Sequence, residues 1–424
     1  MKQRRRMNFG LLGERLTHSF SPLIHAELGD YEYCLYEKKP HELDSFLRYA
    51  GFDGLNVTIP YKKTVVPYCR ELSETAKLSG SVNTVTRLKD GSLYGDNTDF
   101  FGFSYLLEKT GINPADGKSI ILGSGGSSQT AQTVLEKMKA REIVVISRSG
   151  KSCENAERSL KCIDNYNNIE KHSDARIIIN TTPVGMYPNN GISPISDFGI
   201  FQNCRAVIDL IYNPSRTELM QQAQERGVLC RNGLAMLAAQ AKKSAEIFTN
   251  SSIADEKIEE IISKIIKMTR NIVLIGMPGS GKTSIGKALA KKTGRKFADT
   301  DDLIVETRGI SIPEIFARDG EKIFRKLESE ALKTLCKNSG FIIATGGGIV
   351  KRLENLRVIR QNGIVVFLDR DISLLPVAGR PLSQKEGINA LVLERMPAYK
   401  SWSEYQIKVH GVEETAEDIL KNLL

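Results

Sequence analysis

The sequence predicts an α/β protein built on parallel sheets, and two observations carry this prediction. Short runs rich in Val and Ile alternate with helical patterns along the chain, at 119–123, 142–147, 176–181, 206–212, 271–276, 341–346 and 364–369. Their nearly continuous apolar character is typical of strands that are buried on both faces, as in parallel sheets. In addition, two glycine-rich segments each follow such a run and precede a helical pattern, an arrangement typical of α/β nucleotide-binding domains.

Loop-like breaks divide the chain into three predicted domains. The stretch KTGINPADGK gives a break near 105–117, and a polar segment followed by a helix with Asp255 in its first turns gives another near 250–270. A chain of 424 residues has room for two or three domains. We therefore expect a first α/β domain, a dinucleotide-binding domain and a domain with a phosphate-binding loop.

Composition and charge narrow the class of partner. Hydrophobic residues make up 41% and charged residues 26% of the chain, which are ordinary values for a soluble folded protein. The formal net charge of +9 favours anionic ligands, but the basic residues are spread along the chain. We therefore expect small-molecule substrates and no nucleic acid. No apolar run approaches the roughly 20 residues of a membrane helix, so we expect no membrane partner.

The N-terminal segment and the cysteines indicate the compartment. The start, MKQRRRMNFG, is basic but lacks the apolar stretch of a secretory signal. None of the seven cysteines forms a CxxC pair, and their number is odd, which favours reduced thiols. These features predict a cytoplasmic protein, while its oligomeric state stays open.

A phosphate-binding loop opens the C-terminal domain. Residues 276–283, GMPGSGKT, match GxxxxGK[ST] and lie between a predicted strand and the helical run SIGKALAKKTG. Glycines let backbone N–H groups approach phosphate, and Lys282 reaches the terminal phosphates. Thr283 is the expected Mg²⁺ ligand. The loop predicts a nucleoside triphosphate site, but it does not distinguish a kinase from a GTPase or a motor ATPase.

The residues after this loop favour a kinase that acts on a small acid. The segment ADTDDLI places Asp299 and Asp301 at the end of a short extended stretch. One carboxylate there can order a magnesium-bound water, and the other can hold an acceptor hydroxyl. Arginines follow in the segments FRK, GRPL and ERMPAY, at Arg325, Arg380 and Arg395. They indicate a carboxylate substrate together with a triphosphate.

The order of these motifs resembles that of shikimate kinase, a nucleoside-monophosphate-kinase-like P-loop fold, over residues 270–424. The matching motifs are DTD, FR, the glycines of 346–348 and RP. The resemblance implies binding of ATP, Mg²⁺ and shikimate, with transfer by positioning and charge neutralisation. It assigns ATP to Gly279, Ser280, Gly281, Lys282, Thr283, Ser284 and Arg380. It assigns shikimate to Asp301, Arg325, Gly347 and Arg395. Catalysis falls to Lys282 and Asp301, and the metal to Thr283, with Asp299 acting through water.

The segment 371–379, DISLLPVAG, departs from the family pattern. It is short and contains no basic residue, whereas the family usually carries an arginine in this lid. This difference affects how the lid is expected to close and how tightly ATP is expected to bind.

The middle domain contains the start of a dinucleotide site. The segment ILGSGGSSQTA places Gly123, Gly125 and Gly126 between a predicted strand and a helix, although its spacing is not a full GxGxxG. At the end of the next strand, SRSGK has no acid for a ribose hydroxyl. Arg148, with Lys151 nearby, can instead hold a 2′-phosphate, so the pattern favours NADP(H).

Polar residues of the first domain form a second group. Ser19 and Ser21 are two residues apart, so on an extended chain their hydroxyls face the same way. Lys62 follows the strand-like LNVTIP, and Asp99 follows GDNT. The other members of the group are Thr58, Asn83 and Asn97. The group suits a small polyhydroxy acid, with Lys62 and Asp99 as an acid/base pair.

This order of residues resembles shikimate dehydrogenase over residues 7–268. The blocks S-x-S-P, N-V-T-x-P-x-K, V-N-T, N-T-D-x-x-G and GLAMLAAQA all match. The resemblance implies a substrate domain of 7–104, to which 234–268 return, and a Rossmann-like NADP domain of 105–233. It implies that NADPH reduces 3-dehydroshikimate, with Lys62 as the acid/base coupled to Asp99. Substrate contacts fall to Ser19, Ser21, Thr58, Lys62, Asn83, Asp99, Tyr212 and Gln240.

The same resemblance assigns the NADP site. Its residues are Gly123, Ser124, Gly125, Gly126, Ser127, Ser128, Ser147, Arg148, Ser149, Lys151, Ile211 and Gly233, with Glu74 near the nicotinamide end. The family's basic loop usually reads N-R-T-x-x-R, whereas 147–151 lacks the first Asn and shifts the second cation. The difference bears on the strength of the preference for NADP.

Together the two resemblances predict a bifunctional chain that makes shikimate and then phosphorylates it, in chorismate and aromatic amino-acid biosynthesis. Other interpretations stay open: a non-catalytic regulator that keeps both folds, a dehydrogenase that prefers quinate or NAD, and a nucleic-acid-dependent P-loop ATPase. The presence of Lys62, Asp99, Lys282, Asp299 and Asp301 argues against the regulator. The lack of a recognisable nucleic-acid-binding motif argues against the ATPase.

Overall fold

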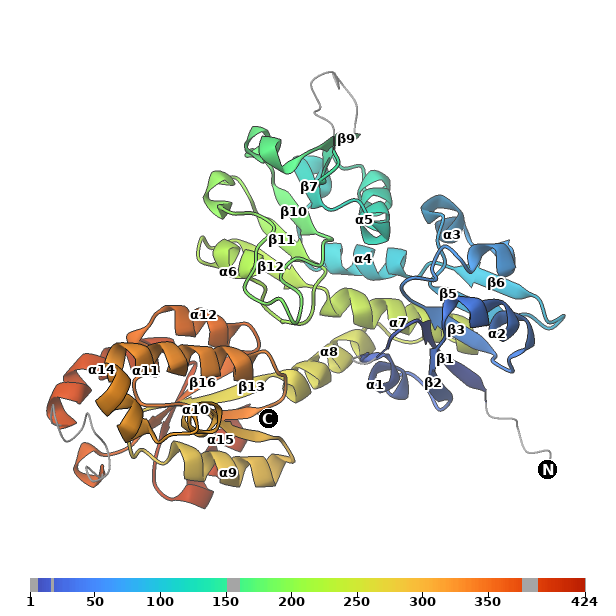
Figure 1. Ribbon diagram of the computed structural model, residues 1–424. Coiled ribbons are helices and arrows are strands. Elements are labelled where there is room, and N and C mark those ends of the chain that lie inside the picture. The colour runs from blue at the N-terminus through green and yellow to red at the C-terminus, as the bar shows by residue number, and fades with distance from the viewer. Residues whose placement is uncertain (1–6, 17–18, 151–160, 376–387, 424) are drawn as a thin grey trace, which may run out of the picture. The chain divides into compact units, whose positions relative to one another are not determined.

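The computed structural model describes residues 7–16, 19–150, 161–375 and 388–423 (Figure 1). The chain forms two compact units. The first unit consists of Met1–Val184, Ser193–Tyr212 and Leu219–Ser263. The second unit consists of Gly185–Ile192, Asn213–Glu218 and Lys264–Leu424. Helix α8 (Glu256–Thr269) includes the boundary between them. Each of the seven apolar runs predicted as strands forms one.

The first sheet of the first unit has the strand order β2-β1-β3-β5-β6-β4. Its strands are β1 (Asn8–Gly13), β2 (Glu32–Glu37), β3 (Gly54–Val57), β4 (Cys69–Leu72), β5 (Thr84–Arg87) and β6 (Leu93–Asp96). This sheet, which contains none of the predicted apolar runs, is mixed, because β5 runs antiparallel to β3 and to β6. A tight turn through Gly91, which has φ +87, joins β5 to β6 directly and leaves no room for a crossover helix.

Short helices accompany this first sheet. They are α1 (Ser21–Ala26), α2 (Leu43–Tyr49), α3 (Glu74–Ser79), α4 (Asp99–Glu108) and α7 (Leu234–Thr249). Phe248 of α7 stacks on Phe9 of β1, with ring centroids 4.5 Å apart. The chain therefore returns to the first sheet long after leaving it.

The second sheet of the first unit is entirely parallel, with the order β12-β11-β10-β7-β8-β9. Its strands are β7 (Lys118–Leu122), β8 (Glu142–Ile146), β9 (Lys161–Asp164), β10 (Ile177–Asn180), β11 (Ala206–Asp209) and β12 (Leu229–Asn232), with helices α5 (Gly126–Lys137) and α6 (Glu218–Gln224). The chain proceeds outward on both sides from the adjacent β7 and β10. This is the doubly wound dinucleotide-binding order, so the Rossmann-like prediction is confirmed.

The second unit contains a parallel sheet of order β14-β15-β13-β16-β17. Its strands are β13 (Asn271–Ile275), β14 (Phe297–Asp299), β15 (Ile342–Ala344), β16 (Gly363–Asp369) and β17 (Tyr405–Lys408). Its helices are α9 (Lys282–Thr293), α10 (Thr300–Arg308), α11 (Ile312–Cys336), α12 (Glu354–Arg360), α14 (Ile388–Trp402) and α15 (Val412–Leu423). Because β13 lies in the middle of the sheet, the loop that follows it stands at the centre of the carboxyl edge.

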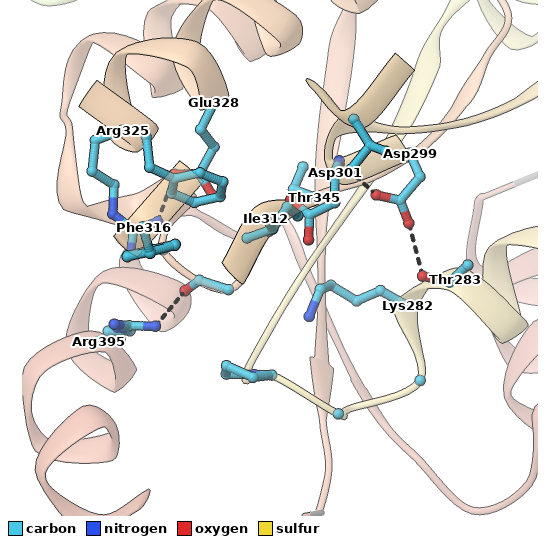
Figure 2. A pocket seen from close by; sticks show the side chains of 18 of the residues that line it. Lys282, Thr283, Asp299, Asp301, Ile312, Phe316, Arg325, Glu328, Thr345 and Arg395 are labelled. Atoms are coloured by element: carbon cyan, nitrogen blue, oxygen red, sulfur yellow. Dashed lines mark hydrogen bonds and ion pairs between the residues drawn. The ribbon is translucent and has the colours of Figure 1, made fainter. Parts of the chain in front are cut away.

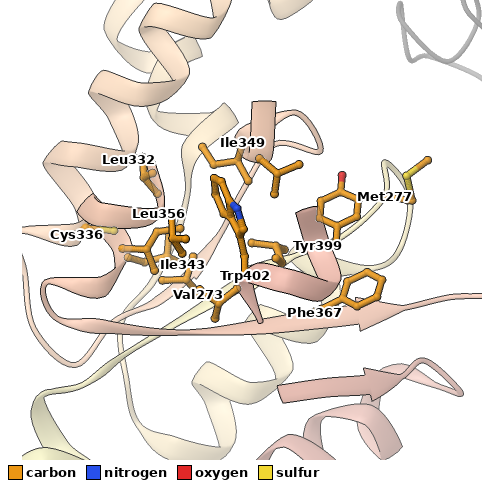
Figure 3. Packing of buried hydrophobic residues seen from close by; sticks show 14 of the residues in the cluster. Val273, Met277, Leu332, Cys336, Ile343, Ile349, Leu356, Phe367, Tyr399 and Trp402 are labelled. Atoms are coloured by element: carbon orange, nitrogen blue, oxygen red, sulfur yellow. The ribbon is translucent and has the colours of Figure 1, made fainter. Parts of the chain in front are cut away.

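Helices cover both faces of this sheet, as the apolar runs predict. Val273 and Ile275 pack with residues of α11, α12 and α14 in one core cluster, which includes Tyr399 and Trp402 (Figure 3). Ile272 of the same strand packs on the opposite face with residues of α9 and α15. Successive side chains of β13 thus enter different cores, which explains its unbroken apolar sequence.

The structure also bears on the predictions about the cysteines and about membrane helices. Cys34, Cys69, Cys204, Cys230 and Cys336 are free thiols, but Cys162 is disulfide-bonded, so the prediction of reduced thiols is wrong at that residue. Sequence spacing alone does not reveal which sulfurs the fold brings together. Within the described ranges, no helix is both long and apolar enough to cross a membrane.

Candidate active sites

A cavity of about 220 Å³ in the first unit collects the predicted substrate residues. All eight of them line it: Ser19, Ser21, Thr58, Lys62, Asn83, Asp99, Tyr212 and Gln240. They come from the loop before α1, from loops beside β3, β5 and β11, and from helices α1, α4 and α7. Most of the lining is hydroxyl, amide or charged, which suits a small polyhydroxy acid.

Lys62 and Asp99 form the charged centre of this cavity. Lys62 Nζ lies 2.5 Å from Asp99 Oδ2, and Asn83 Nδ2 donates to Asp99 Oδ1 at 2.9 Å. Asp99 is the first residue of α4, where the helix dipole favours a negative charge. Both oxygens of Asp99 are therefore fixed, and its carboxylate holds the Lys62 ammonium. The Lys62 side chain keeps 31% exposure, so the ammonium remains open to the cavity.

Asn83 and Gln240 are held by a buried polar network behind the cavity. Thr98 N donates to Asn83 Oδ1 at 2.8 Å, and Thr98 Oγ1 lies 3.4 Å from Gln240 Oε1. Asn56, which the sequence interpretation missed, also lines the cavity and donates to Ser244 Oγ at 2.8 Å. The available signal was its position as the first residue of the N-V-T block.

The predicted NADP glycines lie at the carboxyl end of β7. Gly123 has φ +102, and a Cβ there would come within 2.8 Å of Thr181 Oγ1. Gly125 caps α5, and Gly126, Ser127 and Ser128 form its first turn. Ser124 lies between the two loop glycines. The N-terminus of α5 therefore lies beside a loop with few side chains. Folds of this type bind pyrophosphate at such a helix N-terminus.

The other predicted cofactor residues follow neighbouring strands. Ser147, Arg148 and Ser149 come directly after β8, and Ile211 comes after β11. Gly233 follows β12, and a Cβ there would lie 2.0 Å from Leu210 O, so only glycine fits. Because these strands are parallel, all of these residues gather along one edge of the sheet.

The two remaining predicted cofactor residues are Lys151 and Glu74. Lys151 falls outside the described residues. Glu74 begins α3, is 80% exposed and lies 3.6 Å from Lys137 Nζ of α5. It is not part of the cavity lining, whereas Ser127 and Gly233 are.

A larger cavity of about 710 Å³ in the second unit collects the predicted kinase residues (Figure 2). Ten of them line it: Gly279, Gly281, Lys282, Thr283, Ser284, Asp299, Asp301, Arg325, Gly347 and Arg395. Ser280, which belongs to the same loop, is fully buried and does not line the cavity. Arg380 falls outside the described residues.

The phosphate-binding loop lies at one end of this cavity, and hydrogen bonds hold it in place. Lys282 Nζ donates to the carbonyls of Gly276 and Met277, each at 2.9 Å. Thr283 Oγ1 donates to Asp299 Oδ2 at 2.8 Å, and Asp299 Oδ1 accepts from Asp301 N at 2.9 Å (Figure 2). A threonine hydroxyl beside a carboxylate offers the oxygen donors that Mg²⁺ prefers, so these residues fit the expected metal.

Two carboxylates converge at the other end of the cavity. Asp301 Oδ1 and Glu328 Oε1 are buried, and neither has a hydrogen-bond partner among the described residues. A Cβ at Gly346 would lie 3.0 Å from the first and 2.3 Å from the second. Burial, reinforced by repulsion from Asp299 and Glu328, raises the pKa of Asp301 from 3.8 to about 7. Burial also raises the pKa of Glu328.

Two arginines complete the acceptor end. Arg325 Nη1 donates to Glu328 Oε2 at 2.8 Å, and Arg395 Nη1 donates to Gly347 O at 3.3 Å. Arg395 Nη2 is buried without a partner within the described ranges. A Cβ at Gly348 would lie 1.9 Å from Arg325 Nη1, so the glycine run lets the guanidinium pass. Buried donors and acceptors that lack partners fit a ligand bearing hydroxyls and a carboxylate.

The sequence interpretation missed several residues of this cavity. Glu328 was hidden by its place inside a charged helix, although its spacing three residues after Arg325 gave a signal. Phe316 and Phe324, whose rings lie 4.6 Å apart, read as ordinary core residues. Arg370 also lines the cavity.

Comparisons with known proteins support both predicted activities. The model of the shikimate dehydrogenase substrate-binding domain matches residues 11–85. The shikimate dehydrogenase (NADP(+)) of Clostridium perfringens is 35% identical over 269 residues, which cover 61% of this chain and 97% of the relative. The chain belongs to the shikimate dehydrogenase family. Its C-terminal part, residues 278–424, matches the shikimate kinase family model.

Solved dehydrogenases share the fold of the first unit. A chorismate mutase/shikimate 5-dehydrogenase fusion protein from Clostridium acetobutylicum has a TM-score of 0.56 at 35% identity, covering 62% of this chain and 97% of its own. Shikimate 5-dehydrogenase from Thermus thermophilus, solved in complex with NADP(H) and shikimate, has a TM-score of 0.54 at 27% identity, covering 61% and 99%.

The chain is thus a bifunctional enzyme of the shikimate pathway. It combines an NADP-dependent shikimate dehydrogenase with an ATP- and Mg²⁺-dependent shikimate kinase. These matches favour two activities on small molecules over the interpretations as a regulator or a nucleic-acid-dependent ATPase.

Proposed function

We propose that each activity is carried by the residues of one cavity. Residues 7–104 with 234–268 bind the dehydrogenase substrate, 105–233 bind NADP, and 270–424 form the kinase. The observation that supports this most strongly is that all eight predicted dehydrogenase substrate residues line one cavity, although they are scattered from Ser19 to Gln240. We further propose that the protein works in the cytoplasm.

In the dehydrogenase cavity, Lys62 is the acid/base. NADPH, when bound along the carboxyl edge of the second sheet, supplies the hydride that reduces the carbonyl of 3-dehydroshikimate. The oxygen of that carbonyl must gain a proton as it becomes a hydroxyl. The Lys62 ammonium gives this proton, while Asp99 holds the ammonium through its 2.5 Å contact and Asn83 fixes the carboxylate.

Arg148 holds the 2′-phosphate of NADP and so sets the cofactor preference. Replacing Arg148 with glutamine is expected to raise the KM for NADPH about tenfold or more, because a charge-assisted hydrogen bond to phosphate is lost. The KM for NADH is expected to stay the same. Steady-state kinetics with both cofactors measures this. Arg141→Gln, an exposed arginine at the other end of β8, is the control. Equal changes for both cofactors would contradict the role.

In the kinase cavity, the loop around Lys282 binds the ATP phosphates, and Asp301 faces the acceptor hydroxyl. Mg²⁺, when bound near Thr283 and Asp299, neutralises phosphate charge. Arg325 and Arg395 bind the shikimate carboxylate, and Glu328 keeps the Arg325 guanidinium in place through their 2.8 Å bond. The Asp301 carboxylate takes the proton of the hydroxyl that attacks the γ-phosphate, while the surrounding cations balance the developing charge.

A two-stage assay on the purified full chain tests both activities. NADPH and 3-dehydroshikimate are added first and cofactor oxidation is followed; ATP and Mg²⁺ are then added, and shikimate 3-phosphate is measured. We expect oxidation and then phosphorylation. Oxidation without phosphorylation would refute the proposed kinase function, and no reaction in either stage would restore the regulator interpretation.

A further inference from the structure

Arg370 is a cation at the nucleotide end of the kinase cavity that none of the motifs assigns. It lines the same cavity as Lys282 and Thr283. Its Nη1 donates to the carbonyl of Gly279, within the phosphate-binding loop, at 3.3 Å. The residue is half-buried.

The backbone fixes Arg370 firmly beside this loop. It follows β16, whose Phe367 pairs with Ile275 at the end of β13, immediately before the loop. Leu368 O lies so close to the loop that a Cβ at Gly276 would come within 2.8 Å of it. Arg370 therefore extends from a central strand of the sheet, and its distance from the loop is set by strand pairing.

Among the described residues Arg370 forms no ion pair, unlike the arginines at the acceptor end. Arg325 is paired with Glu321 and Glu328, and Arg395 with Glu394. In the part of the chain that the structure describes, Arg370 has no acidic partner within ion-pair distance, and its one hydrogen bond goes to a neutral carbonyl. A guanidinium has five N–H donors, so most of its donors are available to a ligand.

The nucleotide end needs such a cation. A triphosphate carries about four negative charges, of which Mg²⁺ offsets two and Lys282 one; Arg380, which the resemblance assigns to ATP, falls outside the described residues, and the charge that develops on the transferring group favours a further cation. The segment 371–379, directly after Arg370, contains no Lys or Arg in its sequence.

We propose that Arg370 binds the phosphates of ATP and ADP, acting as the second cation of the phosphate-binding loop. Its planar donor edge matches two phosphate oxygens at once, which a lysine cannot reproduce. The segment 371–379 then need not supply a cation of its own. The inference rests on the proposed kinase function.

The test measures ADP binding to the full chain by calorimetry in the presence of Mg²⁺. Arg370→Gln is expected to weaken ADP binding about 10- to 100-fold, the range for one lost charge-assisted contact. Shikimate binding to the same variant should be unchanged. Arg318→Gln is the matched control, because Arg318 is an exposed arginine of the same unit and is paired with Asp319. It should bind ADP as the wild type does.

Each outcome decides the inference. Wild-type ADP affinity in Arg370→Gln, or an equal loss in Arg318→Gln, overturns it. If Arg370→Gln does not fold, Arg370→Lys is measured instead; it keeps the charge but not the two-donor edge, so wild-type affinity there also overturns the inference. A wild-type chain that binds ADP but does not phosphorylate shikimate refutes the proposed function alone, whereas one that does not bind ADP refutes both.

Discussion

Replacing Asp301 with asparagine is expected to lower the rate of shikimate phosphorylation by about 10²- to 10⁴-fold, the usual range for a lost general base. The amide cannot take the proton of the acceptor hydroxyl. Because Asp301 lies in the second unit, the variant should oxidise NADPH at the wild-type rate. The rate of NADPH oxidation therefore serves as the internal reference in every sample of the two-stage assay.

The pH dependence of the wild type provides a second readout of the same residue. Burial raises the pKa of Asp301 to about 7, so the carboxyl is protonated below that pH and cannot act as a base. The kinase rate should rise as the pH passes through about 7. The free energy of unfolding, in contrast, should fall as the pH rises. Between the ordinary pKa of 3.8 and about 7 the folded state binds a proton that the unfolded state has released, so Asp301 makes stability fall as pH rises.

Asp301→Asn should remove this contribution, so urea unfolding at pH 5 and at pH 8 should show a smaller pH difference in the variant. Asp302→Asn is the matched control, because Asp302 is the exposed neighbour in the same helix. If Asp301→Asn loses less than about tenfold in rate while Glu328→Gln loses more than about 10²-fold, Glu328 is the base instead.

The structure brings the predicted residues of each site to one cavity, partly because several of the motifs follow the carboxyl end of a strand. Once strands such as β7 and β13 are parallel, loops that are distant in sequence must meet at one edge of the sheet. Glycine positions were especially informative. Gly233 is packed so closely against the backbone of Leu210 that no other residue fits, and a side chain at Gly348 would have to displace the Arg325 guanidinium.

Some residues inside helices and strands were missed, although Arg325 and Gln240, which also lie inside helices, were predicted from their motifs. Glu328 lies inside α11 and Asn56 inside β3, where a polar residue gives no sign of which cavity it faces. Arg370 immediately follows a strand, but its function depends on the neighbouring loop at Gly279, which only the pairing of β16 with β13 brings close. The antiparallel strand β5 was missed because its short, partly polar sequence lacks the apolar run of a buried parallel strand.

Replacing Lys62 with alanine is expected to lower the kcat of the dehydrogenase by about 10²-fold or more, while the KM for 3-dehydroshikimate changes little. The reduced oxygen would lose its proton donor, and the Asp99 carboxylate would face the cavity without its 2.5 Å partner. Substrate binding is spread over seven other residues of the cavity, so losing one contact should leave affinity largely intact. Phosphorylation of added shikimate should proceed at the wild-type rate.

Lys63→Ala is the control for this experiment, because Lys63 is the adjacent lysine but is exposed and lies outside the cavity lining. The division between kcat and KM decides the role of Lys62. A loss confined to kcat means that its ammonium acts in the transition state, as the geometry with Asp99 requires. A large rise in KM at unchanged kcat would instead make Lys62 a binding residue, and the proton would have to come from another group of the cavity, such as the Tyr212 hydroxyl.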